Sequence, residues 1–308
     1  FRYFVLNFNK LGLKQLITTS YKPSPVANTQ LQLFSDNKTL TKVKGRPKIT
    51  ANKFIINKVC DIDEDGEFNL KDVAKQLKAN KHNEWTPLKG DGDFRSQECI
   101  ELLKQSDIVV TNPPFSLFRE YIKQLIDYGK KFLIIGNLNA ITYKEVFPLI
   151  KNNKLWIGVT MDGRNKWFQI PDDYPIRENV ANSKIEDDKK FLFVKNCLWF
   201  TNLDHGRRHQ TLNLMTMEEN LKYSKHKEIR DKKAYDKYDN YDAIEVPFTD
   251  AIPNDYKGVM GVPISFLNKY NPDQFEIVKF RHGDDEKDLR LKDGTCPYFR
   301  ILIRHKKK

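Results

Sequence analysis

The sequence predicts an α/β protein with a doubly wound, mostly parallel sheet and a smaller carboxyl-terminal region. Between residues 16 and 204, short apolar runs alternate with segments whose apolar residues recur at helical spacing. Strands that alternate with helices are typical of a parallel sheet covered on both faces. After residue 204 the alternation stops, and a segment rich in Lys, Tyr and Asp leads into one rich in Pro and Gly. A chain of 308 residues can hold both parts, which we expect at 1–204 and 205–308.

The amino-terminal elements follow from local patterns. Residues 5–15 have the apolar spacing of a helix, and residues 16–21 form an apolar run that ends in hydroxyls, among them Thr18. Residues 53–59 have the pattern of a second strand. A helix is expected at 70–79, directly after an acidic turn.

The central elements supply the expected sheet. We expect helices over 96–105, 116–126 and 143–152, where apolar residues recur at helical spacing. Apolar runs predict buried strands at 107–111, 131–137 and 155–159. The strands expected to close the same sheet are 191–194 and 198–201.

Positive charge is concentrated near the amino end. The formal net charge is +12, and residues 1–58 contain eleven Lys or Arg and one acid. A polyanionic partner such as double-stranded DNA suits this balance, and a basic surface kept for solubility is the alternative. Four cations alternate with other residues, so an extended segment would align them along a phosphate backbone: Lys42, Lys44, Arg46 and Lys48. An edge strand protected by lysines fits the same pattern.

Arg207 and Arg208 form a second cationic group, after the end of the expected sheet. Guanidinium groups in such a turn could contact phosphates or the edge of a guanine. A solvated basic turn is the alternative.

Cysteine usage and hydropathy bear on the compartment. The four cysteines are far apart and form no C-x-x-C pair, which favours reduced thiols and a cytoplasmic protein. No apolar run approaches the length of a membrane span, and no signal peptide is visible, so we expect no membrane association. The chain starts at Phe1 within sequence that reads as structured, so we expect that a preceding piece is missing.

Residues 61–72 match the template of an EF-hand calcium loop. Gly66 occupies position six, and acids occupy positions one, three, five and twelve: Asp61, Asp63, Asp65 and Asp72. The segment before the loop reads as a strand, so the entering helix of an EF-hand is missing. We therefore predict no metal site and interpret the loop as an acidic turn that caps the helix at 70–79, with calcium binding as the alternative.

The most informative segment is Asn112-Pro113-Pro114-Phe115, which follows one expected strand and precedes a helix. It therefore lies at the carboxyl end of a strand, where open α/β sheets bind ligands. Two prolines stiffen the backbone and lack an N–H, which leaves their carbonyls free to accept hydrogen bonds. Asn112 Oδ1 and the Pro113 carbonyl would hold an exocyclic amine while Phe115 stacks on its ring. The same acceptors would stabilise positive charge that develops on the nitrogen.

This tetrapeptide resembles the catalytic motif of amino-methyltransferases. Such enzymes move a methyl group from S-adenosylmethionine to a nitrogen of adenine, cytosine or glutamine. A base in a duplex would have to be flipped out of the stack to reach this site.

A second segment, Gly90-Asp91-Gly92-Asp93-Phe94, lies one helix and one strand before the tetrapeptide. An acid followed by an aromatic residue could accept the exocyclic amine of the cofactor's adenine and cover its ring. The alternative is a Gly/Asp turn with a helix N-cap at Asp93 or Ser96. Its position relative to the tetrapeptide favours cofactor binding.

Together these blocks resemble the EcoRI-type family of adenine-specific DNA methyltransferases. The similarity is specific over 89–96 and 107–120, and it extends over most of the chain through 11–17, 50–55 and 261–272. It implies N6-methylation of adenine in a short DNA site with S-adenosylmethionine, usually beside a restriction endonuclease. The base-binding role passes to Asn112, Pro113, Pro114 and Phe115, and the cofactor role to Asp91, Asp93 and Phe94, with Thr18 and Asn112 as further cofactor contacts.

The resemblance also implies the roles of the two parts. Residues 1–204 would be a catalytic domain with the class I S-adenosylmethionine-dependent fold, and residues 205–308 would recognise the target. The family has an earlier strand and loop that hold the methionine end of the cofactor, and nothing before Leu16 matches them. We therefore expect an incomplete amino end.

Three alternatives remain open at the level of sequence. The same chemistry could act on RNA or on a protein glutamine. A chain with half a cofactor site could instead be a DNA-binding fragment without catalysis. The sequence is compatible with a monomer.

Overall fold

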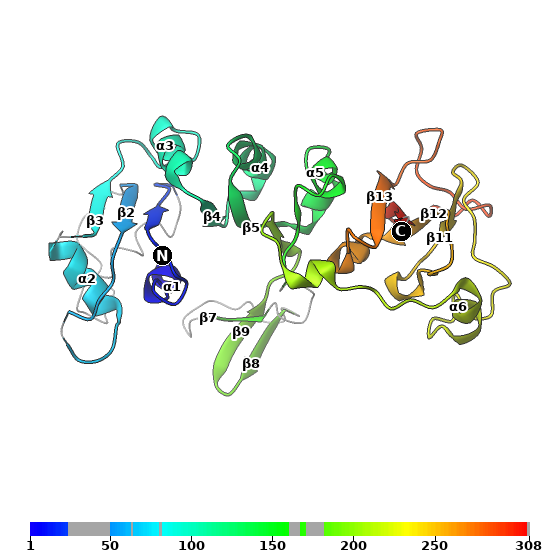
Figure 1. Cartoon of the computed structure of the whole chain (residues 1–308), viewed down its shortest axis with the longest axis horizontal. Coiled ribbons are helices and arrows are strands. Elements are labelled where there is room, and N and C mark those ends of the chain that lie inside the picture. Colours follow the sequence, from blue (N-terminus) through cyan, green and yellow to red (C-terminus); the bar gives the residue numbers. More distant parts are fainter. Residues whose placement is uncertain (24–49, 63, 80–81, 160–166, 171–181, 307–308) are drawn as a thin grey trace. The chain divides into compact units, whose positions relative to one another are not determined.

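A computed structural model describes residues 1–23, 50–62, 64–79, 82–159, 167–170 and 182–306 (Figure 1). The chain divides into two compact units, Phe1–Asp107 and Ile108–Lys308. Five residues singled out in the sequence lie outside the described ranges: Lys42, Lys44, Arg46, Lys48 and Asp63.

The first unit contains a three-stranded antiparallel sheet in the order β1-β2-β3. Phe54 and Ile56 alternate along β2 toward the core, where they meet Val73 and Leu77 of the helix α2. Burial of these apolar side chains holds the helix on the sheet. The elements are α1 (Arg2–Leu6), β1 (Leu16–Thr19), β2 (Asn52–Ile56), α2 (Leu70–Ala79), β3 (Glu84–Pro87) and α3 (Gln97–Gln105).

The acidic turn before α2 is organised by backbone amides. Asp72 is fully buried, and its two carboxylate oxygens accept the N–H groups of Ile62 and Asn69 at 3.0 and 2.9 Å. The Asp61 carboxylate accepts two further backbone N–H groups, those of Glu64 and Gly66, at 2.8 Å each. These bonds satisfy amides that the turn and the helix start would otherwise leave unpaired. Within the described residues, no group of three or more His, Cys, Asp or Glu side chains is arranged to hold a metal ion.

The second unit begins with a four-stranded sheet in the order β4-β5-β10-β6. β4 and β5 are parallel, with Thr111 opposite Ile134, and β10 runs antiparallel to both β5 and β6. The elements are β4 (Ile108–Thr111), η2 (Phe115–Leu117), α4 (Phe118–Asp127), β5 (Lys131–Asn137), η3 (Leu138–Thr142), α5 (Phe147–Lys151), β6 (Trp156–Ile157) and β10 (Cys197–Thr201).

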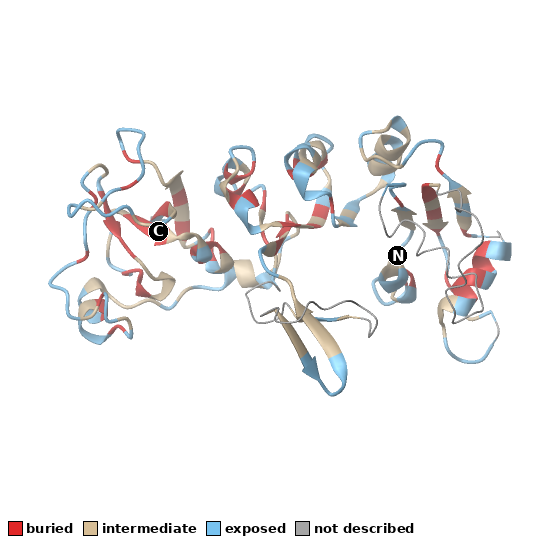
Figure 2. Ribbon diagram, turned by 180° about the vertical axis from the view of Figure 1, so that it is seen from behind, coloured by how far each residue is buried: buried red, intermediate tan, exposed pale blue. Residues whose placement is uncertain are grey.

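A separate antiparallel sheet, in the order β7-β9-β8, is formed between β6 and β10 in the chain. Its strands are β7 (Trp167–Ile170), β8 (Ser183–Glu186) and β9 (Lys189–Phe193), and none of their described residues is buried (Figure 2). Asp187 and Asp188 connect β8 to β9 with left-handed backbone conformations. Left-handed conformations at both central residues are typical of a two-residue hairpin turn.

The carboxyl-terminal sheet has the order β11-β12-β14-β13. β11 is parallel to β12, and β14 is antiparallel to both of its neighbours. Met260 and Val262 of β12 and Ile301 and Ile303 of β14 are fully buried, so these central strands form the core of this part (Figure 2). The elements are η4 (Gly206–His209), α6 (Met217–Tyr223), β11 (Ala243–Glu245), η5 (Thr249–Ala251), β12 (Val259–Pro263), η6 (Ile264–Lys269), β13 (Phe275–Phe280) and β14 (Arg300–His305).

The expected α/β class is confirmed, but the strand pairing differs from the expected mostly parallel sheet. Among the described residues, β4–β5 and β11–β12 pair in parallel, and the other paired strands are antiparallel. The strand expected at 191–194 joins β7 and β8 instead of the sheet that contains β10. Pairing partners lie far apart in the chain, so local hydrophobic patterns do not specify them.

Several elements are shorter or more exposed than expected. β4 was expected to be buried, yet Ile108 is 51% and Val110 is 37% exposed, because β4 is the edge strand of its sheet. The helix expected at 5–15 ends at Leu6, before a turn that closes at Gly12 with a φ of 62°. The helix expected at 143–152 is confined to Phe147–Lys151. No helix in the described ranges is both long and apolar enough to span a membrane.

We predict that Asp72→Ala lowers the free energy of unfolding by about 1–3 kcal/mol, because the partly buried N–H groups of Ile62 and Asn69 lose their acceptor. The control is Asp65→Ala, which removes one exposed bond to the Glu67 N–H and should change stability by no more than about 0.5 kcal/mol. Urea unfolding of the three proteins measures both effects. A calcium-dependent rise in the wild-type midpoint that disappears in Asp61→Ala would contradict the capping interpretation.

Candidate active site

The segment Asn112–Phe115 follows β4 directly and lies at the edge where the parallel strands β4 and β5 both end. Asn112 and Phe115 are exposed, the latter by 39%, whereas Pro113 is buried. The Pro114 carbonyl accepts the Leu117 N–H at 3.0 Å, which starts the η2 turn. In the described part of the chain, the Asn112 amide has no hydrogen-bonding partner, so it is available to a ligand.

Packing behind this segment fixes its position. Phe118, the first residue of α4, is 1% exposed and packs edge-on against Phe200 of β10, with 5.2 Å between ring centroids. A Cβ on Gly136 of β5 would lie 2.4 Å from the Phe118 ring. Glycine at 136 therefore lets the start of α4 approach β5 closely, and the adjoining turn is held against the sheet.

The loop that follows β5 is ordered beside the same edge. The Leu138 N–H donates to the Asn196 carbonyl at 2.7 Å, and the Asn137 side chain accepts the Asn139 N–H at 2.9 Å. Leu138 and Asn139 are exposed. Asn137, Leu138 and Asn139 were not among the site residues predicted from the sequence. Their place at the end of the second parallel strand was the signal that could have pointed to them.

The Gly-Asp segment lies in the first unit, against the end of β1. Gly92 has a φ of 80°, and a Cβ there would lie 2.1 Å from the Ser20 carbonyl oxygen. The Asp91 carbonyl accepts the Lys22 N–H at 2.7 Å. The loop is therefore held beside the hydroxyl-rich end of β1. The hydroxyl oxygen of Thr18 in β1 is buried and has no hydrogen-bonding partner within the described residues.

The two acids of this loop have different surroundings. Asp93 binds the Arg95 guanidinium at 2.9 and 2.7 Å and accepts the Arg95 N–H at 2.8 Å. These hydrogen bonds hold the pKa of the Asp93 carboxyl below its usual value. Asp91 is exposed, and its carboxylate accepts the Asp93 N–H at 3.0 Å. Ser96 caps α3, one of the two N-caps named in the alternative interpretation of this segment, since its hydroxyl accepts the Cys99 N–H.

Comparison with known proteins decides the family. Residues 1–306 match the sequence profile described as adenine-specific methyltransferase EcoRI. The chain belongs to this methyltransferase family. The resemblance inferred from the Asn112 and Asp91 blocks is therefore confirmed.

Relatives of this EcoRI-type methyltransferase are similar over most of its length. It is 44% identical to the Type II methyltransferase M.EcoRI of Escherichia coli over 309 residues, which covers all of this chain and 82% of that protein. It is 43% identical to the Type II methyltransferase M.MgeORF184P of Mycoplasma genitalium, over 71% of each chain. It is 40% identical to the Type II methyltransferase M.MpnI of Mycoplasma pneumoniae, over 71% of this chain and 70% of the relative. No solved structure matches.

Arg207 and Arg208 of this methyltransferase are both engaged with other parts of the chain. The Arg208 guanidinium lies 3.7 Å from the centroid of the Trp156 ring and donates to Asn153 at 3.0 Å, and its side chain is only 11% exposed. Arg207 donates to the Val159 carbonyl at 2.7 Å. Contact of either residue with DNA stays a prediction, and Arg208 would have to leave the Trp156 ring to make it.

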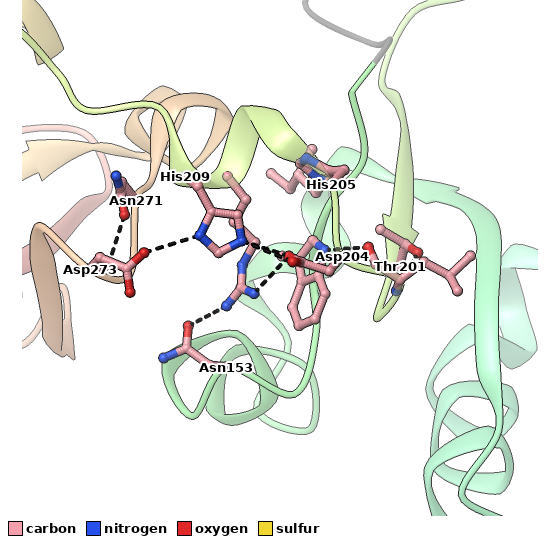
Figure 3. A network of polar contacts seen from close by, with 11 residues as sticks. Asn153, Thr201, Asp204, His205, His209, Asn271 and Asp273 are labelled. Carbon is pink, nitrogen blue, oxygen red and sulfur yellow. Dashed lines mark hydrogen bonds and ion pairs between the residues drawn. The ribbon is translucent and has the colours of Figure 1, made fainter.

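His209 extends this network between two acids (Figure 3). Its Nε2 lies 2.9 Å from a carboxylate oxygen of Asp204, and its Nδ1 lies 3.0 Å from one of Asp273. Hydrogen bonds to Asp273 and Asp204 raise the pKa of His209 above its ordinary 6.5, and the bond to His209 lowers the pKa of Asp204 below 3.8. The imidazolium therefore bridges the η4 turn and the turn before β13.

We predict that the His209 bridge stabilises the fold most between about pH 4 and pH 6.5. A raised histidine pKa contributes stability below 6.5 that is lost as the pH rises through the folded-state value. A lowered Asp204 pKa contributes stability that is lost as the pH falls below 3.8. The thermal midpoint of the wild type should exceed that of His209→Gln in this window, and the difference should shrink at higher pH. A difference in thermal midpoint that is independent of pH would show that the ion pairs of His209 do not stabilise the fold.

Proposed function

We propose that the chain transfers a methyl group from S-adenosylmethionine to the N6 amine of an adenine flipped out of duplex DNA. The observation that carries this proposal is the exposed Asn112–Phe115 turn at the shared end of two parallel strands, in a chain that belongs to an adenine-specific methyltransferase family. Because its relatives are named Type II methyltransferases, we propose that it protects a specific DNA site beside a restriction endonuclease.

Asn112 and the prolines would activate the adenine amine. The lone pair of an aromatic amine is delocalised into the ring, so the nitrogen is a weak nucleophile. Acceptance of both amine protons, by Asn112 Oδ1 and the Pro113 carbonyl, would localise that lone pair and stabilise the positive charge that develops. Pro114 and Pro113 keep the acceptors in place, and the half-exposed Phe115 ring is available to stack on the base.

The residues around β1 fit the cofactor. When bound, S-adenosylmethionine supplies a methyl group already activated by its sulfonium. The exposed Asp91 carboxylate and the Phe94 ring suit an adenosine, and the partnerless Thr18 hydroxyl could bind a polar group of the ligand. Asp93 acts through Arg95 and the loop backbone instead of presenting a free carboxylate. Asn112 stays a predicted cofactor contact.

The fold and location belong to the same proposal. β4 and β5 would be the parallel strands of a class I methyltransferase sheet within residues 1–204, and residues 205–308 would recognise the target sequence. The four cysteines are free thiols in the described structure, which agrees with a cytoplasmic enzyme. The alternatives are RNA methylation, glutamine methylation and DNA binding without catalysis.

Transfer from tritiated S-adenosylmethionine to duplex DNA, RNA and protein tests the proposal. We predict incorporation into duplex DNA at adenine N6. Asn112→Ala should reduce turnover by at least about 100-fold and leave DNA affinity within about twofold, because the lost acceptor acts mainly in the transition state. Asn213→Ala, at another exposed amide, is the control and should retain wild-type turnover. Full activity of Asn112→Ala would exclude the assigned role, and DNA binding without any transfer would favour the non-catalytic alternative.

A pair of glycines tests the cofactor loop. Gly92→Ala should weaken S-adenosylmethionine binding by about tenfold or more, because its methyl group would overlap the Ser20 carbonyl and because the left-handed backbone disfavours alanine. Gly90→Ala is a matched control, since a Cβ there meets nothing within 4 Å. Isothermal titration calorimetry measures both affinities. Equal affinity of the two variants would mean that this loop is not part of the cofactor site.

A further inference from the structure

Tyr298 has the most exposed of the large apolar and aromatic side chains in the described structure, at 78%. It lies in the loop that leads into β14, directly after Pro297. A single exposed aromatic residue is ordinary on a protein surface. What distinguishes Tyr298 is the way its backbone is supported.

The Tyr298 carbonyl is held by a buried ion pair. Arg300 donates from one terminal nitrogen to this carbonyl, and its other nitrogens bind the Glu245 carboxylate at 2.8 and 2.6 Å. Glu245 belongs to β11, and its side chain is 6% exposed, whereas that of Arg300 is 14% exposed. The loop is thereby tied to the interior of the carboxyl-terminal sheet.

A tyrosine and a glycine complete this support. The Tyr238 hydroxyl donates to Glu245, and Tyr238 is 4% exposed. A Cβ on Gly261 of β12 would lie 2.0 Å from the Tyr238 oxygen, so glycine leaves the space in which this hydroxyl reaches the carboxylate. Desolvation makes a buried ion pair a weak source of stability compared with apolar packing. Its clear effect here is to fix the position of the Tyr298 backbone.

The neighbours of Tyr298 suit a nucleic acid. The Phe299 ring lies 4.3 Å from the Tyr298 ring, and the Arg281 guanidinium lies 4.8 Å from the Phe299 ring. Arg281 also binds Asp288 at 2.8 Å and is 31% exposed. An exposed ring that packs against a second ring can stack on a base, and the Arg281 guanidinium lies over that second ring.

We propose that Tyr298 is a DNA contact of the carboxyl-terminal region, with its ring packed on a base or deoxyribose of the duplex that carries the target adenine. This inference rests on the proposed function. Residues 205–308 contain twenty-one Lys or Arg and seventeen Asp or Glu, a net charge of +4, which favours DNA over a second copy of the same positively charged region. The buried Glu245–Arg300 pair holds the backbone from which the ring projects, so little backbone freedom is lost on binding.

Fluorescence anisotropy with a duplex that contains the target site tests this contact. Tyr298→Ala should weaken DNA binding by about 5- to 100-fold, in keeping with the loss of one aromatic stacking contact. Tyr298→Phe should bind like the wild type, because the ring carries the contact. The dependence of affinity on salt should keep its slope in Tyr298→Ala, since tyrosine neutralises no phosphate.

Tyr223→Ala is the matched control. Tyr223 ends α6 and is 71% exposed, and its replacement should leave DNA affinity unchanged. Thermal midpoints confirm folding of each variant, and sedimentation reports the oligomeric state. Wild-type affinity of Tyr298→Ala would overturn the inference, as would a variant that loses self-association and retains DNA binding. If the wild type methylates DNA in those cases, only this inference fails; a wild type that neither binds nor methylates DNA removes the proposed function as well.

Discussion

The contact between Phe118 and the strand β5 is the constraint on which the candidate site depends. Phe118 is buried between Gly136 and Phe200, and any side chain at position 136 would overlap its ring. This packing sets where α4 begins, and the three residues between β4 and η2, Asn112 to Pro114, must then bridge the two elements. Two prolines within that bridge remove most of its remaining freedom. The acceptors for a base amine are therefore positioned by apolar packing behind them, which is how preorganised sites are commonly built.

Local signals predicted the elements whose ends are marked by specific residues. The helices α2 and α3 and the strand β5 lie where the sequence placed them. The pairing of strands was harder to predict from the sequence. β10 pairs with β5 although some sixty residues separate them, and it is antiparallel where a parallel strand was expected. The exposure of β4 was missed for the same reason, since an apolar run reads alike in an edge strand and a central one.

The candidate site illustrates a second limit of sequence. Residue type identified Asn112 and Asp91 as groups that face a ligand, and both are exposed. Residue type could not show that the side chains of Asp72, Asp93 and Arg208 bind other groups of the same chain. Asp72 binds backbone amides, Asp93 binds Arg95, and Arg208 covers Trp156. Charged side chains serve capping and packing as readily as recognition, and only their neighbours distinguish these uses.

The Glu245–Arg300 pair has a consequence for how this family can diverge. Loss of either partner alone would leave the other charge enclosed in the sheet, which is among the more damaging changes a core can undergo. A related protein can therefore lose this ion pair only if both residues are replaced together, or if the sheet first becomes open to water at this place. The two positions, fifty-five residues apart, should therefore change together in evolution. Gly261 and Tyr238 should change with them, because they shape the same space.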